Sequence, residues 1–205
     1  MAEKIVLGMS GGVDSSASAS MLMSRGYEVH GLFLRYRDAD PTPAATAARE
    51  LGIPLEVRDI TCPLEEKVIT PFINEYMSGR TPNPCVICNP GVKFRALIEE
   101  ADRIGAKVAT GHYAVARGGR LYASPSPKDQ SYMLYRLPPE VIARCVFPLG
   151  ETEDKAEVRE LARKAGLSGS QAPDSMEICF IPDGDHAAFI EGRGFCPKKG
   201  NFIDV

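Results

Sequence analysis

Apolar and polar residues alternate in blocks along the first 110 residues. Short apolar runs, each long enough for one strand, lie at 4–9, 28–34, 55–59 and 107–111. Between them, apolar positions that recur every three or four residues predict helices at 14–25, 43–51, 64–77 and 92–104. Strands that alternate with helices are typical of parallel sheets. The pattern therefore predicts an α/β fold with a doubly wound, Rossmann-like parallel sheet.

The pattern changes after residue 113. Two short runs flank Gly118-Gly119, which predicts a two-residue hairpin. Further helices are expected at 129–136, 140–144 and 152–165. In the last of these we expect Thr152 as the cap and Lys155 on the exposed face. The remainder, rich in proline and glycine, is expected to be irregular. We expect a catalytic domain over 1–136 and a helical, irregular extension over 137–205.

Composition sets the broad class of the protein. Its 205 residues are 44% hydrophobic and 25% charged, which is ordinary for a soluble globular chain. No apolar stretch approaches the roughly 18–20 residues that span a membrane, so no membrane association is expected. The first residues have no leader pattern, so we expect a cytoplasmic protein.

Charge is distributed unevenly. Residues 80–136 carry 9 basic and 4 acidic side chains, a net +5, whereas 1–79 and 137–205 each carry −4. A polyanionic partner such as RNA would dock on this basic third. The alternative is a chance bias on a solvated surface.

A glycine-rich turn between a strand and a helix is the sharpest chemical signal. Met9 begins the stretch M-S-G-G-V-D-S-S, in which Gly11 and Gly12 let the backbone approach an anion closely. Free amide groups at the start of the next helix favour phosphate oxygens. A Walker loop would also need a lysine, which is absent here. The alternative is a plain turn in which Asp14 caps the helix.

The turn resembles the PP-loop of the N-type ATP pyrophosphatases, which cleave ATP to AMP and pyrophosphate. Within that group the chain resembles the tRNA-specific 2-thiouridylase (MnmA) family. The motifs that match in order are GRTPNPCVICN at 79–89 with Lys93-Phe94, ATGHYA at 109–114, KDQSYML at 128–134, FPLG at 147–150 and DSMEICFIP at 174–182. Relatives continue into a central domain and a β-barrel, so we expect this chain to be either a naturally short form that lacks them or a fragment. The region 35–47 also departs from the family.

The resemblance implies adenylation and then thiolation of the wobble uridine of tRNA, with ATP and Mg²⁺ required. It assigns ATP binding to Gly8, Met9, Ser10, Gly11, Gly12, Val13, Asp14, Ser15, Leu34 and Gly111, with Asp14 also catalytic. Contacts to tRNA fall on Asn83, Pro84, Cys85, His112, Lys128, Asp129 and Gln130. His112 could instead be a core histidine. A sulfur-donor protein is implied as a second partner.

Cysteines carry the sulfur chemistry in this family. Cys179 matches the persulfide carrier and Cys88 its partner thiol, although Cys179 taken alone reads as a buried structural thiol. Many relatives carry an aspartate, read as a base, where this chain has Cys85. The C-x-x-C variant resembles a subgroup in which Cys85, Cys88 and Cys179 hold a 4Fe-4S cluster. The open readings are this cluster, which we favour slightly, a persulfide–disulfide pair and a structural Zn²⁺. Cys62, Cys145 and Cys196 are interpreted as isolated, buried thiols.

Two other function classes remain open. The chain could be a PP-loop sulfur transferase that acts on another RNA or on a small molecule. It could also be a non-catalytic nucleotide-binding module, although that class would be expected to have a degraded loop or to have lost its cysteines.

Overall fold

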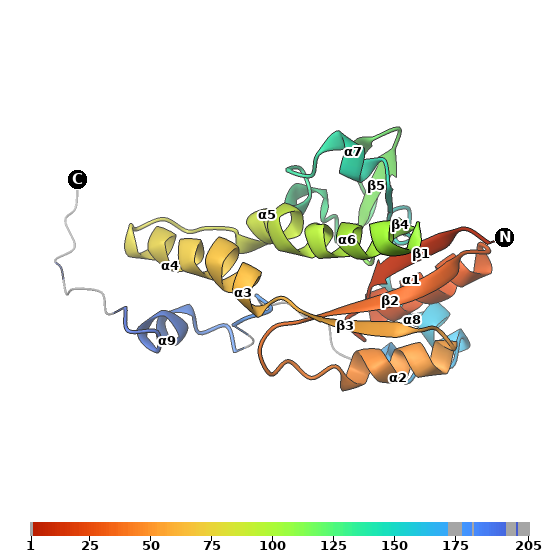
Figure 1. Ribbon diagram of the computed structural model, residues 1–205, viewed down its shortest axis with the longest axis horizontal. Coiled ribbons are helices and arrows are strands. Elements are labelled where there is room, and N and C mark those ends of the chain that lie inside the picture. The colour runs from red at the N-terminus through yellow and green to blue at the C-terminus, as the bar shows by residue number, and fades with distance from the viewer. Residues whose placement is uncertain (1, 172–177, 182, 196–199, 201–205) are drawn as a thin grey trace.

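A parallel five-stranded sheet forms the centre of the molecule (Figure 1). The computed structural model describes residues 2–171, 178–181, 183–195 and 200. The strand order is β3-β2-β1-β4-β7, and every pair is parallel. The strands are β1 (Lys4–Gly8), β2 (Glu28–Arg35), β3 (Leu55–Asp59), β4 (Lys107–Thr110) and β7 (Cys145–Val146). The predicted fold class is confirmed, and the two-residue β7 is an addition that its short pattern did not reveal.

Helices cover both faces of the sheet, because consecutive strand residues point to opposite sides. Val6, Leu32 and Val108 face α6, which forms one core. Ile5, Leu7 and Ala109 face α1 on the other side. The main covering helices are α1 (Val13–Ser24), α2 (Thr42–Leu51), α6 (Phe94–Ile104) and α8 (Lys155–Lys164). Because α8 packs on the side of α1 that faces away from the sheet, this part of the predicted extension is joined to the catalytic domain through α1.

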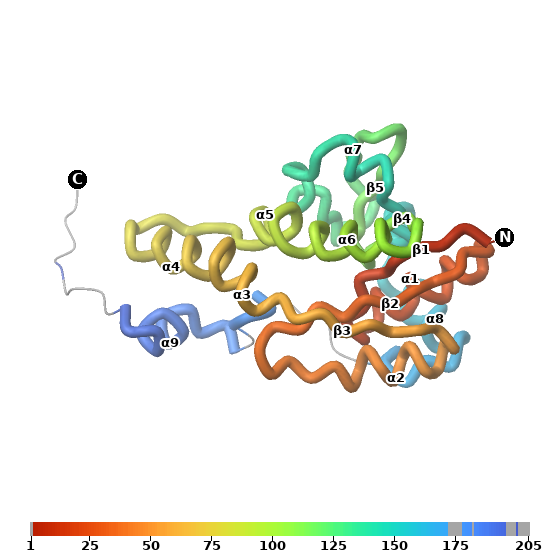
Figure 2. The backbone as a smooth tube through the Cα atoms, viewed as in Figure 1, coloured from red at the N-terminus to blue at the C-terminus, as the bar shows by residue number. Residues whose placement is uncertain are grey.

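A helical arm extends from the sheet beyond β3 (Figure 2). The predicted helix 64–77 is present as α3 (Thr61–Leu64), the π-helix η1 (Glu65–Ile69) and α4 (Thr70–Met77). The chain returns through α5 (Pro84–Cys88) and the π-helix η2 (Asn89–Lys93), which runs directly into α6. One further helix, α9 (His186–Glu191), lies beside the arm and was not expected from the sequence. Phe180, Ile181 and Ile190 pack there against Phe72 and Val92, so the arm has a small core of its own.

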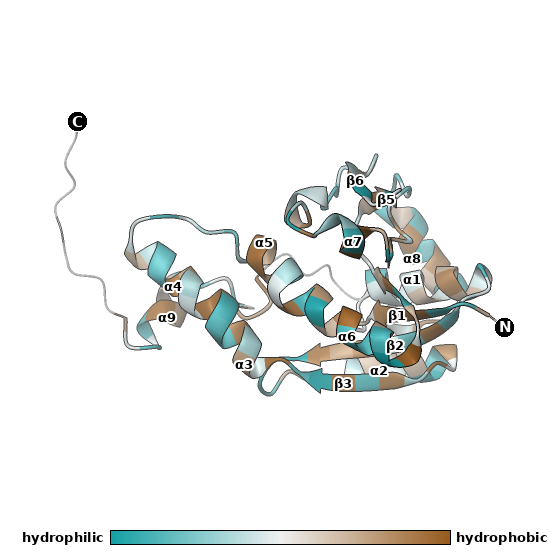
Figure 3. Ribbon diagram, turned by 45° about the horizontal axis from the view of Figure 1, so that its top comes forward, coloured by the Kyte–Doolittle hydropathy of each residue, from teal (hydrophilic) through white to brown (hydrophobic). Residues whose placement is uncertain are grey.

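The predicted hairpin is confirmed as β5 (Ala114–Arg117) and β6 (Arg120–Ala123), with positive φ at both turn glycines. The short elements that follow are η3 (Ser131–Met133), α7 (Pro139–Ile142) and η4 (Ser168–Gln171). The helix predicted over 129–136 is therefore only a 3₁₀ turn at its centre. Strand β3 forms an edge of the sheet and carries many hydrophilic positions, drawn teal in Figure 3. In the described part of the chain, no helix is both long and apolar enough to cross a membrane.

Candidate functional site

The carboxyl ends of the parallel strands meet at one edge of the sheet. From β1 the chain builds outward to β2 and β3, and then crosses to β4 on the other side of β1. Ligands of doubly wound sheets bind outside the strand ends at such a point of reversal. The glycine-rich turn after Gly8 and the stretch that begins at Gly111 both lie there.

Close backbone approach explains the glycines of this turn. Gly11 has φ +82°, and a Cβ placed on it would lie 2.3 Å from the carbonyl carbon of Pro43. A Cβ on Gly111 would lie 3.1 Å from the carbonyl carbon of Asp14. The start of α2 and the end of β4 therefore press on the turn from two sides, and only glycine fits without a shift.

Two serines hold the turn in shape. The Ser10 amide donates to Ser15 Oγ at 3.2 Å, and Ser15 Oγ donates to the Gly12 carbonyl at 3.1 Å. Gly12 is the residue before the helix, and no side chain caps α1 there. The Asp14 side chain is thus not a cap, contrary to the plain-turn alternative. The open amides at the start of α1 fit an anion.

A lysine from α8 lies at Asp14. Lys155 Nζ donates to both Asp14 oxygens, at 2.7 Å and 2.6 Å, and Tyr113 Oη donates to Oδ1 at 2.9 Å. The Lys155 side chain is only 14% exposed, so its predicted place on the exposed face is wrong. The cap is Asp154, not Thr152, because Asp154 accepts from the Ala156 amide at 2.8 Å. Lys155 is then the first helical residue, and its side chain points back past the helix start toward α1.

This cluster brings to the turn a lysine that the turn itself lacks. A Walker loop carries its lysine in sequence, whereas here the lysine comes from 141 residues further along the chain. The three contacts from Lys155 and Tyr113 occupy three of the four acceptor positions of the Asp14 carboxylate, and among the described residues no donor reaches the fourth, at Oδ2, which suits it to a further ligand. The residues present therefore fit a magnesium-bound phosphate group.

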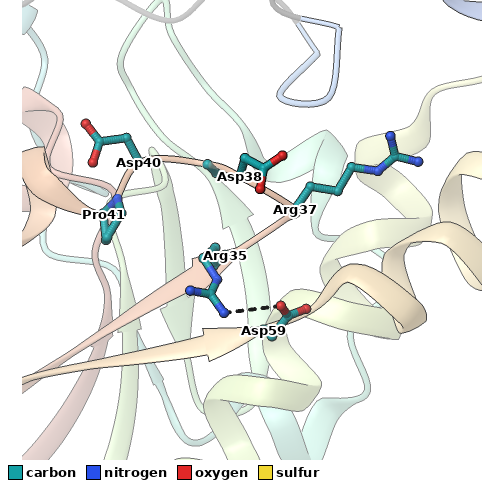
Figure 4. A pocket seen from close by; sticks show the side chains of 7 residues that line it. Arg35, Arg37, Asp38, Asp40, Pro41 and Asp59 are labelled. Atoms are coloured by element: carbon teal, nitrogen blue, oxygen red, sulfur yellow. Dashed lines mark hydrogen bonds and ion pairs between the residues drawn. The ribbon is translucent and has the colours of Figure 1, made fainter.

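Beside the turn, the segment after β2 borders an open pocket of about 720 Å³ (Figure 4). Arg35 and Asp59 form an ion pair of 3.4 Å across its floor, and Asp38 and Asp40 border its rim. The pocket lies at the ends of β2 and β3. Its lining overlaps region 35–47, which is expected from the sequence to differ from the family, and Leu34 lies half-buried directly before that region.

The thiols of Cys88 and Cys179 are brought together by the core of the helical arm. Asn83 caps α5 by accepting from the Cys85 amide at 3.1 Å, which places Cys85 and Cys88 on a defined helical turn. Ile178, Phe180 and Ile181 pack into the same apolar cluster as Cys88. The charge of Cys179 acts on the pKa of Cys88, and that of Cys85 acts on the pKa of both.

Desolvation controls the reactivity of these thiols. Burial raises the pKa of Cys88 to about 11, against the lowering effect of Lys93. Cys179 is exposed as a residue, yet crowding by protein atoms raises the pKa of its thiol as well, and Lys93 again opposes this. Both thiols are therefore protonated at neutral pH until a partner or a base activates them.

The predicted cluster ligands do not form a metal site as they stand. Among the described residues, no group of three or more His, Cys, Asp or Glu is arranged to hold a metal ion. Of the isolated thiols, Cys145 is buried as expected, whereas Cys62 is exposed, which corrects the expectation for it. Cys196 lies outside the described residues, as do residues 174–177 and 182 of the motif around Cys179.

The residues assigned to tRNA fall into two environments. Lys128 is exposed, whereas Asp129 accepts from the amides of Ser124 and Ser131 at 2.7 Å and 3.3 Å and so shapes the loop. Gln130 exchanges hydrogen bonds with the Tyr113 backbone. Pro84, the first residue of α5, is buried, and Asn83 precedes it as the cap of that helix.

His112 has the surroundings of a core residue. It is buried, its Nδ1 lies 2.7 Å from Thr110 Oγ1, and its ring stacks on Phe94. Burial, followed by the charge of Lys93, holds its pKa well below 6.5. The imidazole is therefore neutral, which fits the core-histidine alternative. A direct contact with RNA stays a prediction.

An ion cluster ties the segment behind Cys179 to the sheet. Arg193 donates to the two Glu65 oxygens at 2.6 Å and 3.0 Å and to Tyr36 Oη at 2.9 Å. Arg37 also donates to Glu65, at 2.7 Å. The bonds from Arg193 are the main reason that the pKa of Glu65 falls to about 2. We call the contact between Glu65 and Arg193 the Glu65–Arg193 clip. Neither this clip nor the Lys155–Asp14 pair had a local sequence signal, because the two residues of each pair lie more than 100 positions apart in the chain.

A family model described as "tRNA methyl transferase HUP domain" matches residues 3–183. A tRNA-specific 2-thiouridylase MnmA of Syntrophotalea carbinolica is 47% identical over 98% of this chain and 62% of its own length. A second protein of that name, from Carboxydothermus hydrogenoformans, is 41% identical over 99% of this chain and 62% of its own length. The chain thus spans somewhat less than two thirds of these relatives.

Solved structures share the fold. An NMN synthetase from Francisella tularensis superposes with a TM-score of 0.55 at 20% identity, covering 85% of this chain and 67% of that one. A 4-thiouridine synthetase in complex with RNA and bound ATP gives 0.53 at 22% identity, covering 83% and 43%. At these identities the likeness is one of fold alone.

Proposed function

Since the chain belongs to the family described as the tRNA methyl transferase HUP domain, we propose that it takes part in ATP-dependent thiolation of a uridine in tRNA. The observation that carries this proposal is the presence of two sites in one fold. One is an anion-binding turn with Asp14 and Lys155, and the other is a pair of thiols, Cys88 and Cys179, in one apolar cluster. A methyl transferase would need neither a phosphate-binding turn nor a pair of thiols, so the two sites together favour sulfur transfer over methyl transfer. A tRNA substrate would place the protein in the cytoplasm.

The turn would act in the first step. ATP phosphates would bind the amides from Gly11 to Ser15, with Lys155 neutralising charge that grows on the departing pyrophosphate. The uridine 2-oxygen attacks the α-phosphorus, an O–P bond forms, and pyrophosphate leaves. Mg²⁺ bound with the phosphates would screen their charge, and the remaining acceptor position of Asp14 is suited to hold it.

The thiols would act in the second step. A sulfur-donor protein charges Cys179 as a persulfide, whose outer sulfur attacks carbon 2 and expels AMP. The Cys88 thiolate then attacks Cys179 Sγ, which breaks the persulfide S–S bond and leaves sulfur on the base. An external thiol reduces the resulting Cys88–Cys179 disulfide. A raised thiol pKa means that both cysteines need activation, which Lys93 assists by its charge.

The 4Fe-4S cluster stays a separate prediction. The described residues do not present three ligands in a geometry for a metal, so we route no step through it. Iron and acid-labile sulfide in anaerobically reconstituted protein would support it, and the absence of both would exclude it.

Product analysis of ATP and Mg²⁺ with and without bulk tRNA, under anaerobic conditions, tests the proposal. We expect AMP and pyrophosphate to rise with tRNA, and 2-thiouridine to appear in the digested tRNA when a persulfide donor is present. AMP that forms without dependence on tRNA would favour the small-molecule or other-RNA transferase. If no AMP forms under any condition, the chain is a binding module by itself.

A further inference from the structure

Two exposed tyrosine rings follow the predicted tRNA-contact segment. Tyr132 is 53% exposed and Tyr135 is 68% exposed, whereas Leu134 and Leu137 are buried. This three-residue spacing follows the 3₁₀ geometry of η3 and the turn after it, in which residues i and i+3 lie on one side. The leucines anchor the turn in the core, and the two tyrosines therefore share its outer side.

Neither ring is used by the fold. Among the described residues, Tyr132 and Tyr135 form no hydrogen bond and no ring contact. A third ring, Tyr122, is 48% exposed on β6, a strand that lies in contact with η3. Several aromatic side chains that are half-exposed or more on adjoining elements are typical of surfaces that bind a partner.

The charge around the rings is positive. Arg120 and Arg136 are exposed, and neither has a carboxylate partner in the described part of the chain. The nearest acidic residues in sequence are Asp129 and Glu140. Asp129 is occupied by hydrogen bonds to the backbone and hydroxyl of Ser131 and to the Ser124 amide, whereas Glu140 is exposed in the first turn of α7. Aromatic rings set among unpaired arginines complement a nucleic acid strand, in which bases stack and phosphates carry charge.

The rings also lie beside the thiol-bearing helix. Asn89 Nδ2, in the π-helix directly after Cys88, donates to the Met133 carbonyl at 3.1 Å. Element η3 therefore touches both the hairpin and the segment from α5 to η2. A strand of RNA whose uridine reaches Cys88 would pass this surface.

We propose that Tyr132 and Tyr135 form a stacking ledge for an unpaired RNA base next to the uridine that is modified. This rests on the proposed function, and it adds a contact that fixes which nucleotide enters the site. Three residues of 3₁₀ helix rise about 6 Å, close to the roughly 7 Å that two stacking separations of about 3.4 Å require. One base fits between two rings at that spacing.

The test measures binding of a fluorescent anticodon stem-loop RNA, and of a fully paired duplex of similar length, by anisotropy at fixed salt. Tyr132→Ala and Tyr135→Ala should each weaken stem-loop binding about 5- to 150-fold, the range for loss of one stacked base. Duplex binding should stay the same, because a duplex offers no unpaired base. Tyr132→Phe and Tyr135→Phe keep the ring and should bind within about twofold of wild type. Met23→Ala, which alters an exposed apolar side chain at the far end of α1, is the matched control.

Each result decides the ledge separately from the proposed function. Wild-type affinity in the alanine variants, equal loss on the duplex, or a wild-type chain that binds no RNA would overturn the ledge. If the alanine variants lose stem-loop binding but wild type makes no thiouridine, the ledge stands and the thiolation proposal falls. If wild type thiolates tRNA and the alanine variants do so equally well, thiolation stands and the ledge falls. If the alanine variants bind a sulfur-donor protein more weakly but bind RNA as tightly as wild type, the surface contacts the sulfur donor and the ledge is overturned.

Discussion

The phosphate end and the thiol end of this molecule are built in different ways. The phosphate end is one contiguous strand, turn and helix, in which Gly11 and Ser15 hold the shape locally. The thiol end joins two segments more than 90 residues apart, α5 and the stretch around Cys179, and only the apolar cluster of the arm unites them. A local motif fixes geometry by itself, whereas an assembled site depends on every contact that holds its second segment.

The two ends also differ in charge. At the phosphate end, Lys155 and Asp14 form an ion pair before any ligand binds, so the lysine already lies beside the turn. At the thiol end, burial keeps Cys88 protonated, so this site is inactive until something draws a proton away. This difference fits a reaction in which adenylation precedes sulfur transfer, and it lets substitutions separate the two steps.

Replacement of the proposed carrier thiol, Cys179, should have the largest effect. Cys179→Ser removes the sulfur nucleophile, so we expect no detectable thiouridine in tRNA. AMP formation should persist within about threefold, because the phosphate end does not contact Cys179. Mass spectrometry of digested tRNA and chromatography of ATP products measure the two steps. Cys62→Ser, at an exposed thiol, is the matched control and should change neither. Loss of AMP formation as well would make Cys179 a structural residue.

Loss of the distant lysine should act on the other step. Lys155→Met removes the cation at Asp14, and we expect AMP formation to fall roughly 10²- to 10³-fold, as when one preorganised donor is lost. Lys155→Arg should recover part of the rate, since it restores charge at a different length. Lys164→Met, at an exposed lysine in the last turn of the same helix, controls for general effects on α8. Undiminished AMP formation in Lys155→Met would mean that the pair serves only to dock α8 on α1.

These contrasts show what the sequence can and cannot predict. The turn at 9–16, the hairpin and most strand boundaries follow from local spacing, since period and glycine positions encode them directly. Lys155 was misplaced because Asp154 caps its helix and not Thr152. This difference of two residues makes Lys155 the first helical residue, whose side chain points back toward α1. Helix α9 and strand β7 are too short for a periodic pattern, and they form because the arm and β4 offer them partners. The Glu65–Arg193 clip joins residues 128 apart and has no local signature at all.

The smallest effect is expected from substitutions in the Glu65–Arg193 clip, and their effect on the free energy of unfolding depends on pH. Because the pKa of Glu65 is about 2 in the folded chain, below its ordinary value near 4.5, its ionised form stabilises the fold above pH 4.5. That contribution is lost as pH falls from about 4.5 toward 2. The shift corresponds to at most about 3 kcal/mol, and solvent screening of the partly exposed pair reduces it to roughly 1–2 kcal/mol.

Glu65→Gln should therefore lower the free energy of unfolding by roughly 1–2 kcal/mol at pH 7 and by less than half of that at pH 3, as measured by urea titration. Arg193→Lys should behave similarly, because lysine cannot contact Glu65 and Tyr36 at once. With the segment behind Cys179 loosened, thiolation should slow a few-fold while AMP formation is unchanged. Glu75→Gln, which breaks an exposed pair with Arg80 on the same arm, should change little. An equal decrease in the free energy of unfolding at pH 7 and pH 3 would show that Glu65 acts through packing rather than charge. Normal thiolation in these variants would show that the Glu65–Arg193 contact does not help to position Cys179.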